Sequence, residues 1–188
     1  MPFFAAAVAA LGAMLIPLWP SLASPTSNRS SSSGARTPPG WRWEVSPGRI
    51  PGAGAYRVAL PPELRTILTK GVNSYVSEYR SKSLKLILDF GAYGSSGVKE
   101  CQQHSSSCAT GTTIIGGVTA IRTSYYEKDP DGDLPYRLSY YIPFGAQPPS
   151  PAVARWRISL KIWVECETRA ACNLADRIVK TIEVIRDR

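Results

Sequence analysis

The sequence contains a single histidine, His104, in 188 residues, and this scarcity limits the catalytic chemistry it can support. A Ser–His–acid triad would have to use His104, yet no serine lies in the GxSxG motif of α/β-hydrolases. Gly116-Gly117 is not followed by the Lys or helix of a phosphate-binding loop. No acidic residue lies in an apolar setting that would raise its pKa, so a glycosidase pair cannot be assigned. These absences favour a non-enzymatic protein, and the alternative is a small secreted hydrolase with His104 as its general base.

Metal-ligand spacings are also missing. The four cysteines form no CxxC motif, which argues against a zinc ribbon or a redox site. Residues 129–133 (DPDGD) alternate carboxylates as calcium loops do, but Leu134 stands where such a loop needs glycine. We interpret this stretch as a hairpin turn and expect neither a metal nor a cofactor.

Residues 1–24 carry no charged side chain. The apolar run ends in Ser21-Leu22-Ala23, which places small residues at the −3 and −1 positions of a signal-peptidase site. The sequence therefore predicts a signal peptide over residues 1–23 and a periplasmic or secreted protein. The alternative is an uncleaved anchor over residues 3–23, since about 20 apolar residues span a bilayer. In that case the protein would be a membrane-tethered envelope scaffold.

The cysteines agree with export, because they form two close pairs, Cys101 with Cys108 and Cys166 with Cys172. An even number of cysteines at short spacings in an exported chain predicts disulfides. Three connectivities are possible, and we favour the two local bridges.

Residues 24–60 are rich in Ser, Pro and Gly and predict a disordered tail or linker. Within them WRWEV (41–45) is interpreted as a strand that docks on a sheet edge. Half of the net charge of +8 lies in residues 25–60, and 61–188 hold 17 basic against 13 acidic residues. This mild excess argues against nucleic acid as a partner.

Residues 61–188 predict one α+β domain of order α-β-β-β-β-α. Apolar residues from Leu64 to Tyr79 recur at helical spacing, and those of 169–186 form a stripe after Thr168 as N-cap. Alternation predicts four strands, over residues 83–93, 112–127 (with a bend at Gly116-Gly117), 134–144 and 154–167. The short connections favour an antiparallel meander covered on one face by both helices, which is a two-layer sandwich.

The other face of this sheet is the candidate binding surface. In residues 154–167 the even-numbered side chains are apolar and the odd-numbered ones are mostly charged. The predicted outward-facing set is basic and aromatic: Lys85, Arg137, Tyr141, Arg155, Arg157, Lys161 and Trp163. Guanidinium groups suit carboxylates, and aromatic side chains anchor interfaces. We therefore expect a binding domain for an acidic protein or an anionic cell-surface polymer; the alternative is a solvated face whose cations limit aggregation.

Overall fold

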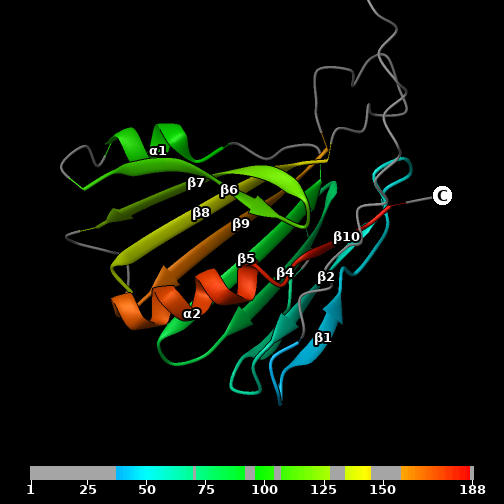
Figure 1. Cartoon of the computed structure of the whole chain (residues 1–188), viewed down its shortest axis with the longest axis horizontal. Coiled ribbons are helices and arrows are strands. Elements are labelled where there is room, and N and C mark those ends of the chain that lie inside the picture. The colour runs from blue at the N-terminus through cyan, green and yellow to red at the C-terminus, as the bar shows by residue number, and fades with distance from the viewer. Residues whose placement is uncertain are drawn as a thin grey trace, which may run out of the picture. The chain divides into compact units, whose positions relative to one another are not determined.

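The protein is mainly a β structure in its computed structural model, which describes residues 37–69, 71–91, 96–103, 107–127, 134–144 and 158–186 (Figure 1). In this part of the chain ten strands form two antiparallel sheets, and there are two helices. This finding overturns the predicted fold of a four-stranded meander with two flanking helices.

The larger sheet has seven strands among the described residues. In chain order they are β3 (Arg65–Leu68), β4 (Ser74–Arg80), β5 (Leu84–Gly91), β6 (Ala109–Ile115), β7 (Val118–Tyr126), β8 (Tyr136–Pro143) and β9 (Ser159–Cys166). Across the sheet the order is β3-β4-β5-β9-β8-β7-β6. The strand β9 thus lies between β5 and β8, so the strands do not pair in sequence order.

The smaller sheet has the order β1-β2-β10. Its strands are β1 (Arg42–Val45), β2 (Ala55–Leu60) and β10 (Glu183–Ile185). Both β1 and β2 lie within the segment expected to be a tail, so ordered structure begins well before residue 61. Residues 41–45 were expected to form a strand that docks on a sheet edge. Residues 42–45 form β1, which lies at the edge of the smaller sheet and pairs with β2.

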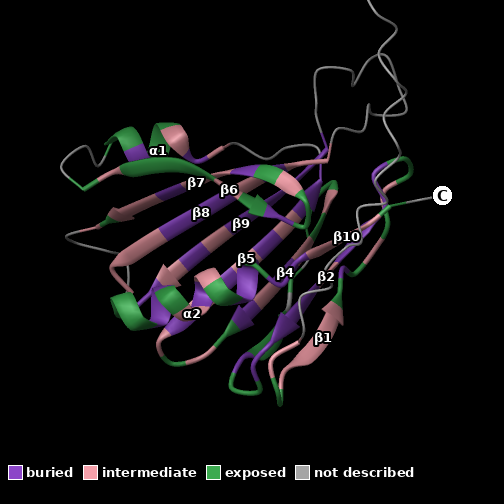
Figure 2. Ribbon diagram, viewed as in Figure 1, coloured by how far each residue is buried: buried purple, intermediate pink, exposed green. Residues whose placement is uncertain are grey.

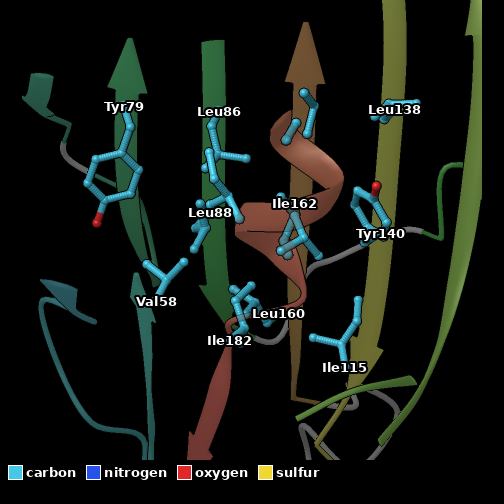
Figure 3. Close-up of a cluster of buried hydrophobic side chains, with 14 of the residues drawn as sticks. Val58, Tyr79, Leu86, Leu88, Ile115, Leu138, Tyr140, Leu160, Ile162 and Ile182 are labelled. Carbon is cyan, nitrogen blue, oxygen red and sulfur yellow. The ribbon is translucent and has the colours of Figure 1, made fainter. Parts of the chain in front are cut away.

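The hydrophobic core lies against one face of the large sheet. Along β5 the residues Leu84, Leu86, Leu88 and Phe90 are fully buried and alternate with half-buried ones, as Figure 2 shows. Helix α2 (Arg169–Val179) contacts β5, β8 and β9 on that face and also contacts β2. The core therefore joins side chains of both sheets and the segment after α2 (Figure 3): Val58, Tyr79, Leu86, Leu88, Ile115, Leu138, Tyr140, Leu160, Ile162 and Ile182.

The predicted N-terminal helix is wrong, because its residues form the hairpin of β3 and β4. In β4 the residues Ser77 and Tyr79 are buried, which is the alternation of a strand. Asn73 has a φ of 67°, in the left-handed region, so the backbone reverses direction just before β4. A β-hairpin whose second strand buries Ser77 and Tyr79 thus replaces a helix that would bury every third or fourth residue.

The strand predicted over 112–127 is also wrong in one respect, because it is two strands. Gly116 and Gly117 have φ values of 57° and 78° and form the turn between β6 and β7. A two-residue turn with positive φ at both central positions fits the twist of a β-hairpin.

The predicted C-terminal helix is shorter than expected: Thr168 caps α2, as predicted, but Ile185 lies in β10.

Neither helix among the described residues is long and apolar enough to cross a lipid bilayer. The segment 1–23, for which the sequence predicts a signal peptide or anchor, lies outside the described residues.

Candidate functional site

The pairing register places five of the predicted binding residues on one face of the large sheet, opposite to the core. Lys85 of β5 is paired with Glu165 of β9, which is paired with Arg137 of β8. In the same way Trp163 is paired with Ile87, and Lys161 with Tyr141. We call this side of the sheet the outer face.

The cations of the outer face are matched by carboxylates. Lys85 Nζ lies 3.2 Å from Glu165 Oε1, and Arg137 Nη1 lies 3.0 Å from Glu165 Oε2. Arg137 Nε also donates to Glu127 Oε2 at 2.7 Å. Burial opposes the guanidinium charge, but the contacts with Glu127 and Glu165 outweigh it and raise the pKa of Arg137. The field of these two cations is therefore largely neutralised at short range.

Part of the outer face is covered rather than open. The short helix α1 (Val98–Gln103) contacts β6 and β7 on this side. The residue before it, Gly97, has a φ of 72°, and a Cβ there would lie 2.3 Å from Ser139 Oγ. Only a glycine allows the chain to approach the sheet this closely.

Lys161 lies under this cover, with 2% of its surface exposed. Its Nζ is 3.8 Å from Glu100 Oε1 of α1 and 3.9 Å from the centre of the Trp163 ring. Burial lowers the pKa of Lys161, because a low-dielectric setting disfavours the charged form. Lys161 was predicted to point toward solvent, and its side chain is instead buried beside α1.

Beside this cover the outer face contains a cleft of about 370 Å³. Three half-buried apolar or aromatic side chains line it, from Ile87, Tyr125 and Trp163. The charged lining groups are Arg137, Glu100 and Glu165. We call this the outer-face cleft. It combines an aromatic surface with an ion-paired arginine at its wall.

Several predicted residues lie outside the described part of the chain. These are Arg155 and Arg157 of the binding set, His104, and the acidic stretch 129–133. Tyr141 lies on the outer face and is half-buried, but it does not line the outer-face cleft.

A second polar cluster, which the sequence interpretation did not single out, joins α2 to the sheet. Arg122 of β7 donates from Nε and Nη2 to the two carboxylate oxygens of Asp176, each at 3.2 Å. Tyr140 donates its hydroxyl hydrogen to the same carboxylate. Burial, together with the negative charge of Asp176, raises the pKa of Tyr140.

This cluster lies at the wall of a cavity of about 480 Å³ between α2 and the strands β7 and β8. A signal for it was present in the sequence. Arg122 alternates in phase with Ala120 and Ser124, and Ala120 is fully buried. An arginine on the core side of a strand needs a buried acidic partner.

The two disulfides join Cys101 to Cys108 and Cys166 to Cys172, which are the local bridges predicted. The first ties α1 to the start of β6, and the second ties the end of β9 to α2. The described residues contain no group of three or more His, Cys, Asp or Glu side chains that could hold a metal ion.

Comparison of the chain with protein-family models, with curated proteins and with solved structures finds no match.

Proposed function

We propose that this chain is an exported, non-enzymatic binding domain that recognises a protein partner through the outer-face cleft. The observation that carries the proposal is the composition of the cleft, in which Trp163, Tyr125 and Arg137 lie together. Tryptophan, tyrosine and arginine are the residues that contribute most often to binding hot spots. The cleft walls are built on strands and on a disulfide-bonded helix, so little order has to be gained on binding.

The charges of the cleft favour a protein segment over a simple anion. Its lining includes one cation, Arg137, and two carboxylates, Glu100 and Glu165. An anionic polymer would have to displace Glu165 or Glu127 from the arginine. A peptide with an apolar side chain and its own polar backbone matches the mixed lining better.

Export is supported by the uncharged segment 1–24 and by the two disulfides, which persist in oxidising compartments. Intact mass of the protein purified from its native source tests this part. We expect the mass of residues 24–188, less the hydrogens lost from two disulfides. A mass that retains residues 1–23 would instead identify the anchored form.

The cleft is tested by site-specific photocrosslinking in the native envelope or secretome. A photoreactive amino acid replaces Ile87 in one protein and Ile67 in a control. Ile67 pairs with Glu78 of β4, and Glu78 pairs with Ile87 of β5, so the two isoleucines lie on the same face of the sheet. Ile67 does not line the cleft, which makes it a matched control.

We expect a discrete adduct from position 87 and not from position 67, and we expect excess unmodified protein to compete for it. Adding Trp163→Ala to the position-87 protein should weaken the adduct. Equal labelling at both positions, or labelling that the Trp163 change leaves intact, would show that the cleft is only a solvated surface.

A further inference from the structure

The two sheets present four edge strands among the described residues, namely β1, β10, β3 and β6. An edge strand exposes unpaired backbone N–H and C=O groups and can pair with a strand of another molecule. Natural proteins usually protect such edges with short strands and charged residues. The four edges here differ sharply in that protection.

Three of the edges are short and charged. Strand β1 has four residues, and its Arg42 donates to the carbonyl oxygens of Pro61 and Leu64 at 3.2 and 2.7 Å. Strand β10 has three residues and begins with Glu183, which pairs with Arg57 at 2.6 Å. Strand β3 has four residues and begins with Arg65.

Strand β6 has none of these protections. It is seven residues long, with the sequence ATGTTII, and contains no charged residue and no proline. Five of its residues are exposed, including Ile114 with 63% of its surface accessible. Within the described structure, β7 is the only strand that pairs with it.

Both ends of β6 are held in place. The disulfide between Cys101 and Cys108 ends one residue before the strand. At the other end a Cβ on Gly116 would lie 3.1 Å from the carbonyl oxygen of Ile182, so the turn rests against the segment that follows α2. A strand fixed at both ends loses little conformational entropy when it pairs.

We propose that β6 is a self-association edge, which pairs antiparallel with β6 of a second copy of this chain about a two-fold axis at Thr112. Antiparallel pairing of identical strands is two-fold symmetric, as an isologous dimer requires. The absence of charge removes the like-charge repulsion that identical strands otherwise meet.

The side chains of β6 are complementary to themselves in this register. Thr110 of one copy would face Ile114 of the other, and Gly111 would face Thr113. The larger residue of each pair meets a smaller one, and no atom lies within 4 Å of the position of a Cβ on Gly111, so the space beside it is open. Opposed β-branched residues are among the favourable cross-strand pairs.

Seven paired residues bury less surface than a standard stable interface, so the dimer is expected to be weak. The test is sedimentation of the mature protein, without the apolar segment 1–23, over a range from about 1 µM to about 500 µM, which brackets micromolar dissociation constants. We expect the average mass to rise from monomer to dimer as the concentration increases.

Charge at the proposed axis supplies the specific test. Thr112→Lys puts two lysines opposite one another and should weaken the dimer by about tenfold. Thr112→Glu should do the same, and an equimolar mixture of the two variants should restore dimers. Thr66→Lys is the matched control, because Thr66 is an exposed threonine on the opposite edge strand β3. It should leave the dimer unchanged.

A wild-type protein that stays monomeric over the whole range overturns the proposal, whether or not β6 then pairs with a strand of a different protein. A dimer that is equally sensitive to Thr66→Lys, or variants at Thr112 that do not complement one another, also overturns it. Circular dichroism of each variant confirms that the fold is retained.

Discussion

The contact of Tyr140 with Asp176 leads to a quantitative prediction for the substitution Tyr140→Phe. Tyr140 lies in β8 with 2% of its surface exposed, and its hydroxyl group donates to the Asp176 carboxylate of α2. The substitution removes one oxygen atom and leaves the ring in the core. The two hydrogen bonds from Arg122 to Asp176 remain, so the carboxylate keeps a cationic partner.

A hydrogen bond to a charged group contributes about 1.5–3 kcal/mol to stability. Because Asp176 retains Arg122, we expect the lower half of that range, a loss of about 1.5–2 kcal/mol. For a protein of this size a loss of 1 kcal/mol lowers the Tm by about 2–4 °C. Tyr140→Phe should therefore lower the Tm by about 3–8 °C.

Urea unfolding at neutral pH, followed by circular dichroism, measures this loss. Tyr56→Phe is the matched control, because Tyr56 is also fully buried and its hydroxyl group donates a long hydrogen bond, of 3.4 Å, to the uncharged Ser77 Oγ. We expect that control to cost about 0.5–1 kcal/mol. If the two variants lose equal stability, Tyr140 does not anchor α2 through Asp176, and the reasoning fails.

Two further predictions concern buried titratable groups. Burial raises the pKa of Tyr140, so above about pH 10 an unfolded chain releases this proton while the folded chain keeps it. The contribution of Tyr140 to the free energy of unfolding should therefore be constant below about pH 10 and decrease above it. In urea unfolding at successive pH values Tyr140→Phe should make that fall shallower, and an unchanged slope would contradict the assignment. Burial lowers the pKa of Lys161, which means that burial disfavours its charge. The substitution Lys161→Met removes this charge and the contact with Glu100 but keeps the length of the side chain. It should leave the free energy of unfolding unchanged or raise it by up to about 1 kcal/mol. A loss above about 2 kcal/mol would show instead that the ion pair with Glu100 stabilises the fold.

The parts of the fold that the sequence predicted are strands with strict alternation. Residues 84–90 and 160–166 place a large apolar side chain at every second position, and no helix can bury that set on one face. The local disulfides were predictable for a similar reason, because short spacings bring the cysteines close in any compact fold.

The segment 64–79 shows where periodicity fails. Its apolar residues satisfy the helical pattern through Leu64, Ile67 and Leu68, but the second half also alternates. Residues 71–73 separate the halves, and Asn73 has a positive φ. Periodicity alone does not distinguish one long helix from two short strands joined at such a turn.

Strand order is a long-range property, and the sequence pattern carries little information about it. The strands β5 and β8 each have one apolar face, so either could pair with any strand of similar length. Strand β9 enters between them because its own face continues the core on both sides, with Leu160 and Ile162 beside residues of β5 and β8. The meander was expected because neighbouring strands usually pair, and this contact of distant segments overrides that tendency.

The candidate site depends on the same long-range pairing. Alternation correctly placed Lys85, Arg137 and Lys161 on the face opposite to the core, but it treated their charges as available to a ligand. The register places Glu165 between Lys85 and Arg137. Helix α1, which lies between β5 and β6 in the chain, brings Glu100 close to Lys161. A strand pattern reports which face a residue occupies, whereas the partner that neutralises its charge comes from a different strand or loop. The net charge of a sheet face can therefore be judged only after the strand order is known. For this protein the sequence led us to expect an acidic protein or an anionic polymer as the ligand, and the ion pairs set by the strand order are the reason why we propose a protein segment with both apolar and polar groups instead.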